Sequence, residues 1–247
     1  MFHPQGPTFV ELARQALSST EKGYNLLAPK FDYTPFRTPS DVLQVFRIWI
    51  HEFGPFESVL DVCCGTGAAM QAIAPEITKR VVGLDMSKPM LQQGQLNLEE
   101  LADARQDLDF EFIHGNAFQM PFENEFDLAI SFGAFGHILP KDESEFVAQI
   151  FKSLKRGGRF AFLTTEMPSM ATPTYWMARG FNAAIHVRNL LIRPPFIMYY
   201  LTFLWPSIGE KLQDAGFSVT AFPVSRFSTA QGKNIDHIKF VMATKPG

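Results

Sequence analysis

The feature that most constrains the fold is a regular alternation of short apolar runs with amphipathic segments in the middle of the chain. Five runs have the length and composition of strands: residues 58–62, 80–85, 108–115, 126–133 and 159–166. Helix patterns separate them; one begins near residue 67, and others cover residues 87–106 and 142–158. Because strand and helix alternate, the sequence predicts parallel βαβ units in a doubly wound α/β sheet.

The two ends of the chain depart from this alternation. Residues 216–224 and 236–245 are typical of two strands, and the Gly/Ser/Asn-rich connection between them is too short for a crossover helix. We therefore expect a mostly parallel, seven-stranded sheet with a C-terminal antiparallel hairpin. Residues 167–206 exceed a normal connection, which predicts a helical lid inserted between strands five and six. Residues 1–40 are interpreted as an N-terminal cap segment, followed by a helix capped by Ser40, within a single domain over residues 1–247.

Composition excludes several classes of protein. The net charge is −3 and there is no run of Lys or Arg, which argues against a nucleic-acid surface. The two cysteines are adjacent, so they cannot bridge distant segments or supply the spaced ligands of a zinc site, and we expect no metal and a reducing, cytoplasmic location. No signal-peptide pattern is visible, and the longest apolar run (residues 194–208) is shorter than the roughly 20 residues of a membrane-spanning helix.

The stretch VLDVCCGTGAAM (residues 59–70) carries the clearest chemical signal. It places Asp61 at the end of the first predicted strand, and Gly65 and Gly67 in a tight turn before a helix, where open α/β sheets bind ligands. A carboxylate there would repel a pyrophosphate and suits a cationic ligand, which disfavours a dinucleotide. Asp85 ends the second strand, where an acid can accept both hydroxyls of a ribose. A ligand with a ribose and a cation, such as S-adenosylmethionine, fits this pair of acids.

Four segments in order extend this interpretation: VLDVCCGTG, GLDMS, GNAFQMPFENEFDLAISFGAFGHI and LKRGGRFAF. Together they resemble the successive motifs of class I S-adenosylmethionine-dependent methyltransferases, in the small-molecule branch that includes the quinone-biosynthesis enzymes. The resemblance covers about Tyr24 to Phe162 and the terminal hairpin. Cys63 departs from the commonest pattern, which has its first glycine at this position.

The resemblance implies a cofactor site built from residues that follow the predicted strands and from the N-terminal cap. The matching positions are Asp61, Cys63, Gly65, Thr66 and Gly67 around the methionine part, Asp85 on the ribose, Met86, Asn116 and Ala117 beside the adenine, the backbone of Ser131 and Phe132 near the amino group, and Tyr24 and Tyr33 closing over the cofactor.

Other reactive side chains keep two interpretations. His137 follows the fourth strand and is either a general base facing the acceptor or a histidine that only packs. Glu166 follows the fifth strand and is either a substrate contact or a solvated loop acid. Cys63 and Cys64 are expected to fill the turn as small apolar groups. Asp127 is interpreted as a turn residue, whereas His114 is expected to be structural and His186 to lie on the surface.

The predicted lid is rich in aromatic residues: Trp176, Phe181, Phe196, Tyr199, Tyr200, Phe203 and Trp205. They either cover the sheet edge, or line an apolar pocket or contact a membrane surface. Arg179, Arg188 and Arg193 on the same segment suit either an anionic substrate or anionic lipid headgroups. We expect several of Trp176, Phe196, Tyr199, Tyr200 and Phe203 to face a cavity beside the transferred methyl group.

The sequence as a whole predicts methyl transfer from S-adenosylmethionine to a small, hydrophobic or aromatic acceptor. A non-catalytic S-adenosylmethionine-binding protein and a protein methyltransferase remain as alternatives. The expected partner is thus a small molecule, with a transient membrane-surface contact through the lid as a further hypothesis.

Overall fold

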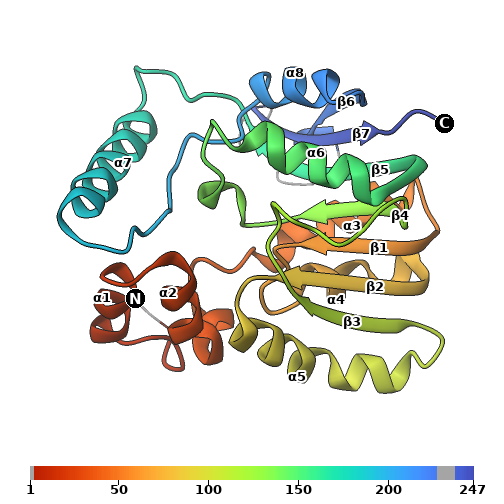
Figure 1. The fold of residues 1–247 in the computed structure, drawn as a ribbon, viewed down its shortest axis with the longest axis horizontal. Coiled ribbons are helices and arrows are strands. Elements are labelled where there is room, and N and C mark those ends of the chain that lie inside the picture. Colours follow the sequence, from red (N-terminus) through yellow and green to blue (C-terminus); the bar gives the residue numbers. More distant parts are fainter. Residues whose placement is uncertain (1–2, 227–236) are drawn as a thin grey trace.

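The computed structural model describes residues 3–226 and 237–247, and in these ranges seven strands form one sheet in the order β3-β2-β1-β4-β5-β7-β6 (Figure 1). The first five strands are parallel, and β7 runs antiparallel between β5 and β6. The predicted doubly wound sheet with a C-terminal antiparallel pair is confirmed. Most of the predicted connection between the last two strands (residues 225–235) lies outside the described residues. The strands are β1 (Phe56–Val62), β2 (Ile77–Asp85), β3 (Asp109–His114), β4 (Phe126–Ser131), β5 (Leu154–Thr165), β6 (Ser218–Pro223) and β7 (Ile238–Thr244).

Helices cover both faces of the sheet, which explains why the central strands are apolar along their whole length. Neighbouring residues of β1 point into different cores: Val59 packs with α3, α4 and α5, whereas Leu60 packs with α6 and α8. The described helices are α1 (Phe9–Ala16), α2 (Thr20–Leu27), α3 (Ser40–His51), α4 (Ala68–Ile73), α5 (Lys88–Ala104), α6 (Glu143–Ser153), α7 (Pro173–Leu191) and α8 (Ser207–Asp214), with short 3-10 turns at Ala28–Tyr33, Ala74–Glu76, Phe135–His137 and Val224–Arg226.

Two predicted boundaries are wrong. The helix expected over residues 142–158 ends at Ser153, and β5 already begins at Leu154, which is fully buried and pairs with Phe126 of β4. Core burial and strand pairing therefore outweigh the helix pattern of the following Lys and Arg residues. The α3 N-cap is Pro39, not the expected Ser40, and no side chain caps this helix. By contrast, the Ser87 hydroxyl accepts a hydrogen bond from Met90 N and begins α5 as predicted.

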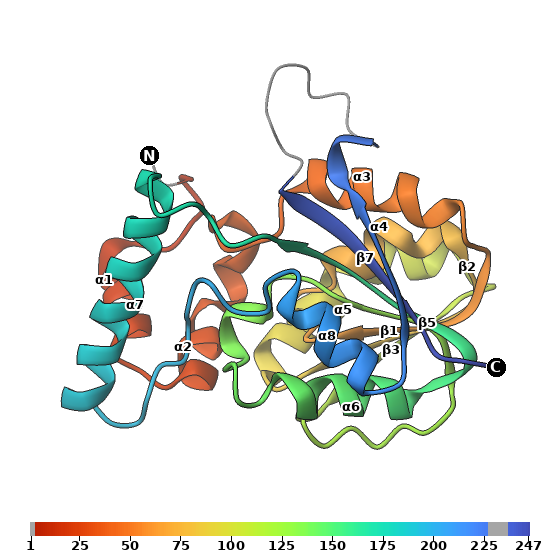
Figure 2. The ribbon, with the colours of Figure 1, turned by 90° about the horizontal axis from the view of Figure 1, so that it is seen from above.

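The N-terminal helices and α7 lie beyond the carboxyl ends of the parallel strands, at the end of the molecule away from the C-terminus (Figures 1 and 2). Two polar contacts fix this position. The Thr66 hydroxyl donates to Asp32 Oδ1 at 2.7 Å, and the Ser87 hydroxyl is 2.6 Å from Asn25 Oδ1. The N-terminal segment is therefore attached to the loops that follow β1 and β2.

The segment after β5 carries α7 and then returns to the sheet without further helix until α8. Its return is anchored at Phe203, whose side chain is 1% exposed and stacks on Phe135 with ring centroids 4.0 Å apart. The Phe203 amide donates to Glu143 Oε1, and the Phe203 carbonyl accepts from the Thr164 hydroxyl. Phe203 thus belongs to the core under α6, and this corrects the expectation that it faces a ligand cavity.

This anchor leads to a stability prediction. Replacing Phe203 by Ala removes a fully buried ring and should lower the free energy of unfolding by about 3–5 kcal/mol. Urea denaturation followed by circular dichroism measures the change. Tyr200→Ala is the matched control on the same segment, because Tyr200 is 49% exposed and its loss should cost less than about 1 kcal/mol. Equal losses for the two variants would contradict the anchoring role.

Candidate active site

The turn between β1 and α4 is built from backbone conformations that favour glycine. Cys63, Gly65 and Gly67 have φ angles of 62°, 54° and 78°. A Cβ on Gly67 would also lie 2.9 Å from Leu98 Cδ1 of α5, so a larger residue there would have to displace that side chain as well as strain the backbone. The left-handed conformation of Cys63 explains why glycine is the commoner residue at this position in the motif that the chain resembles.

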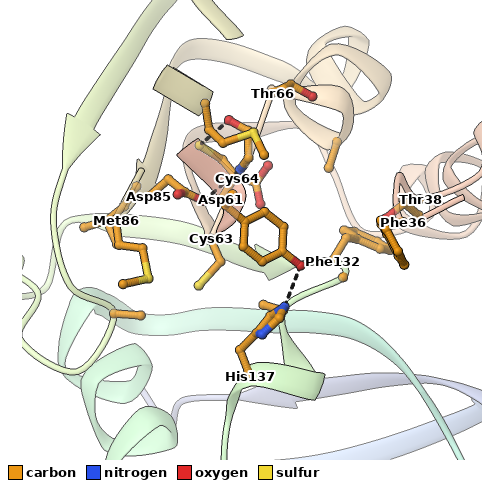
Figure 3. A pocket seen from close by; sticks show the side chains of 18 of the residues that line it. Phe36, Thr38, Asp61, Cys63, Cys64, Thr66, Asp85, Met86, Phe132 and His137 are labelled. Carbon is orange, nitrogen blue, oxygen red and sulfur yellow. Dashed lines mark hydrogen bonds between the residues drawn. The ribbon is translucent and has the colours of Figure 1, made fainter. Parts of the chain in front are cut away.

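A cavity of about 270 Å³ opens at this turn, at the carboxyl ends of β1, β2 and β4 (Figure 3). Its walls come from the turn itself, from the loops after β2, β3 and β4, and from the N-terminal segment. The sequence-predicted residues that line it are Tyr24, Asp61, Cys63, Gly65, Thr66, Asp85, Met86, Ala117, Phe132 and His137. These residues lie far apart in the sequence and are brought together by the sheet and the cap.

Four predicted residues do not line the cavity. Tyr33 is 41% exposed and stacks on His3, and it is not among the residues that line the cavity. The Ser131 hydroxyl is fully buried and donates to Val62 O, where it ties β4 to β1. Asn116 is exposed and caps its own loop by accepting from Phe118 N, and Gly67 lies behind the turn at the start of α4.

Asp61 is the most unusual polar group in the cavity. Its residue is 1% exposed, and within the described ranges its Oδ2 atom has no hydrogen-bond partner. Burial, followed by the nearby Asp85 carboxylate, raises the pKa of Asp61 well above its usual range. A buried carboxylate oxygen without a donor is costly unless a ligand supplies one, so this wall of the cavity fits a cationic hydrogen-bond donor.

Asp85 already has structural partners. Its Oδ2 accepts from Gly65 N at 3.0 Å, and its Oδ1 accepts from Ser87 N at 2.8 Å. Burial raises the pKa of Asp85, and these backbone hydrogen bonds oppose the rise. Each carboxylate oxygen can accept a second bond, so Asp85 can hold the glycine turn and still receive ligand hydroxyls. Met86 next to it is 47% exposed at the cavity rim, and its carbonyl is 3.0 Å from His114 Nε2.

His137 and Tyr24 form a hydrogen-bonded pair on another wall of the cavity (Figure 3). His137 Nδ1 lies at the Ile197 carbonyl, which can only accept, so Nδ1 carries the proton and Nε2 accepts from the Tyr24 hydroxyl at 2.7 Å. Burial lowers the pKa of His137, and burial with the nearby Asp85 charge raises the pKa of Tyr24. Both groups are therefore neutral at neutral pH, and Nε2 holds the lone pair of a base.

Sequence reasoning missed Asp32. Its carboxylate accepts from the Thr66 hydroxyl, from Arg37 Nε at 3.1 Å and from Asn97 Nδ2 at 2.7 Å, so it joins the cap, the glycine turn and α5. No local spacing marks this acid, because it lies in an irregular, Pro-broken segment. The same segment supplies further walls of the cavity, namely Thr20, Phe31, Phe36, Arg37 and Thr38.

The remaining candidates lie away from the cavity or play no chemical part in it. Burial raises the pKa of both the Cys63 and the Cys64 thiols, so neither is an activated thiolate. Glu166 pairs with Lys239 at 3.1 Å. Asp127 lies on β4 and pairs with Lys155, so its interpretation as a turn residue is wrong. His186 is exposed on α7, as expected.

The aromatic residues of the 167–206 segment do not line the cavity as expected. Only Ile197 of this segment is among its described walls. Trp176 is 63% exposed, and Phe196 is buried beside Gly23 of α2. Tyr199 and Tyr200 contact residues of α7: the Tyr199 hydroxyl accepts from Asn189, and the Tyr200 ring packs on Phe181. The segment therefore uses its aromatic rings for its own packing, with an exposed remainder on α7.

Comparison with known proteins agrees with this site. A family described as a methyltransferase domain matches residues 59–158. A demethylmenaquinone methyltransferase of Listeria welshimeri is 32% identical over 197 residues, which cover 74% of this chain and 78% of the relative. The chain belongs to the class I S-adenosylmethionine-dependent methyltransferases, of the quinone-biosynthesis type. A second such relative, from Bacillus cereus, is 36% identical over 124 residues, or 49% of this chain and 50% of its own length.

Solved structures show the same fold. An S-adenosylmethionine-dependent methyltransferase of Methanosarcina mazei has a TM-score of 0.58 at 18% identity and covers 80% of this chain and 97% of its own. The magnesium protoporphyrin IX methyltransferase of Synechocystis, solved with bound SAH, has a TM-score of 0.56 at 15% identity, with 83% and 82% covered.

The cofactor of the methyltransferase is S-adenosylmethionine. The cavity fits this group for two reasons. The unpartnered Asp61 oxygen requires a hydrogen-bond donor, which the cationic cofactor can supply. The space beside the glycine turn is open, because a Cβ on Gly65 would meet no atom within 4 Å.

The buried Asp61 charge predicts opposite effects on stability and binding. Asp61→Asn should raise the free energy of unfolding of the ligand-free methyltransferase at neutral pH, because it removes an uncompensated charge, and should weaken S-adenosylmethionine binding at least about tenfold. The raised pKa means that the contribution of Asp61 to stability is fully present below the usual value of 3.8 and is lost as pH rises through the folded-state pKa. The gain in Asp61→Asn should therefore grow with pH in urea denaturation, and calorimetry measures the affinity.

Asp127→Asn is the matched control with the opposite sign. Although burial raises the pKa of Asp127, hydrogen bonds from Lys155 and Ser58 lower it below its usual value. Its stabilising effect is present above the unfolded-state pKa and is lost as pH falls. This variant should be less stable than the parent at neutral pH and should bind the cofactor normally. A destabilised Asp61→Asn protein with full affinity would show that Asp61 is a structural acid only.

Proposed function

We propose that the protein methylates a small, apolar, aromatic acceptor that carries an acidic hydroxyl group, such as a phenol or a hydroquinone. The observation that carries this proposal is the pairing, in one cavity, of the unpartnered Asp61 carboxylate with the neutral Tyr24–His137 pair between apolar walls. The names of the demethylmenaquinone methyltransferases to which the chain is similar support the same acceptor class.

The cofactor half of the cavity is assigned to the sheet. When bound, S-adenosylmethionine supplies a methyl group that its sulfonium already activates. Asp61 and the backbone of residues 63–66 would hold the methionine part, and Asp85 would hold the ribose hydroxyls. Met86 and Ala117 would border the adenine. When ionised, the two buried carboxylates at this edge of the sheet would favour a cationic cofactor over the neutral thioether that remains after transfer.

The acceptor half is assigned to the N-terminal cap and the loop after β4. Phe31, Phe36 and Phe132 give this half an apolar lining, which excludes water and favours a flat aromatic acceptor. Tyr24 closes the wall next to His137, and its hydroxyl donates to Nε2 until the hydroxyl of the acceptor replaces it. The enzyme therefore selects its acceptor chiefly by shape and burial.

In this arrangement His137 Nε2 removes the proton of the acceptor hydroxyl. The O–H bond breaks, the proton moves to Nε2, and the freed electron pair makes the acceptor nucleophilic. When bound, S-adenosylmethionine would supply the methyl group that the deprotonated acceptor takes, with the neutral thioether as the leaving group. The Ile197 carbonyl keeps the Nδ1 proton in place, which holds the ring in the tautomer required for this step.

The proposal predicts the effect of removing the base. His137→Ala should lower turnover about 10²–10⁴-fold with little change in cofactor affinity. Because burial lowers the pKa of His137, the neutral form persists to lower pH, so turnover of the parent should begin to fall only below the usual value of 6.5. His186→Ala on α7 is the matched control and should behave like the parent. Equal turnover of His137→Ala and parent would leave His137 with a packing role.

An acceptor panel tests the substrate class. Release of S-adenosylhomocysteine should be faster with hydroquinones and phenols than with sugars or peptides of similar size. Preferred methylation of a polar, sugar-like acceptor would overturn the proposal. Cofactor binding without release for any acceptor in the panel would favour a non-catalytic binding protein.

A further inference from the structure

Helix α7 presents its apolar side to solvent. The residues on this side recur at helical spacing and are all apolar or small: Trp176, Met177, Gly180, Ala183, Ala184, Val187, Leu190 and Leu191. We call them the α7 apolar face. Trp176, Met177 and Leu191 are 63%, 74% and 79% exposed, and no residue of the helix is buried. A helix at the surface of a globular protein normally turns such a stripe toward the core.

Polar contacts hold α7 in this orientation from its inner side. Arg188 donates to the carbonyls of Ala16 and Ser18 at the end of α1, at 2.9 and 2.7 Å. Asn182 exchanges hydrogen bonds with the Tyr200 backbone, and Asn189 does the same with the backbone of Phe196. The exposure of the α7 apolar face is therefore imposed by specific hydrogen bonds on the opposite side.

Helix α1 adds apolar side chains at the same end of the molecule. Phe9, Val10 and Leu17 are 78%, 58% and 58% exposed. Figures 1 and 2 both show α1 beside α7 at the end away from the C-terminus. Exposed apolar area gathered at one end, beyond what scattered surface residues explain, marks an interaction surface.

The charge of this region indicates the kind of partner. The chain as a whole carries −3, but residues 167–209 contain no Asp or Glu. Arg179 and Arg193 are exposed on this stretch, and Arg14 is exposed on α1. Two copies of the same positive face would repel each other, whereas an anionic lipid headgroup layer complements both the charge and the apolar side chains.

We propose that α7, together with α1, docks on a membrane interface that contains anionic phospholipids. The helix has 19 residues, so at 1.5 Å per residue it would extend about 28 Å parallel to the membrane surface, with the α7 apolar face toward the acyl chains. Within residues 3–226 and 237–247, no helix is long and apolar enough to cross a membrane. The surface does not depend on the identity of the methyl acceptor.

Flotation of the full-length protein with vesicles tests the docking surface. The protein should float with vesicles of phosphatidylcholine and phosphatidylglycerol, and it should float less with phosphatidylcholine alone or in high salt. Failure to float with the anionic vesicles would overturn the proposal. Equal binding to both vesicle types would overturn the assigned role of the arginines.

Matched variants locate the surface. The double variant Trp176→Ser, Leu190→Ser should weaken vesicle partition by about tenfold or more, whereas Leu96→Ser on α5, at a site 65% exposed, should leave it unchanged. Arg179→Glu should weaken binding to anionic vesicles more than Arg156→Glu, which alters an exposed arginine at the start of β5. Equal losses in target and control variants would contradict the assignment.

Two further measurements separate this inference from the proposed function. Each α7 variant should keep the helical circular dichroism of the parent and its calorimetric affinity for S-adenosylmethionine, because α7 lies outside the cofactor half of the cavity. Light scattering tests the alternative that a second copy of the chain covers the α7 apolar face. A dimer of the parent that is absent in the Trp176→Ser, Leu190→Ser variant would show this instead.

Discussion

The structure depends on a carboxylate that binds two backbone amides. Parallel pairing of β1 with β2 sets Asp61 opposite Gly83, two residues before Asp85, so both acids emerge at the same edge of the sheet. Asp85 then accepts from Gly65 and Ser87, and this joins the glycine turn to the start of α5. Asp61 lies next to this glycine turn and is 1% exposed. One side chain therefore organises the loops that form this edge of the cavity.

The cavity combines a general fold with a particular N-terminus. The sheet and its first two loops provide the wall that carries both acids, and the cap adds Tyr24, Phe31 and Phe36 to the apolar wall. Asp32 connects these parts through its carboxylate. It accepts hydrogen bonds from Thr66 of the glycine turn, Arg37 of the cap and Asn97 of α5. The two parts of the cavity wall are thus mechanically linked, although they arise from distant parts of the chain.

Features of the fold and the site that depend on neighbouring residues could be predicted from the sequence, whereas features that depend on contacts between distant segments could not. The strands and the positions of Asp61 and Asp85 follow from local apolar runs that end in an acid, and the sheet type follows from their alternation. Asp32 and the contrast between Tyr24 and Tyr33 could not be predicted, because they depend on how an irregular segment docks on loops far along the chain. The prediction that the aromatic residues after β5 line the cavity failed for a related reason. Composition indicates that such rings will be packed, but it does not indicate which residues they pack against.

The hydrogen bond between His137 and Ile197 links the imidazole in the cavity wall to an accessory element. Ile197 lies on the return of the segment that carries α7, and its amide is fixed by the Thr20 hydroxyl of the cap. The proton arrangement on the imidazole is therefore inherited from a loop that the sheet fold does not require. A related chain that trims this loop would have to recruit a new acceptor for Nδ1 or lose its tautomer bias, so loop length and acid–base chemistry should change together during divergence.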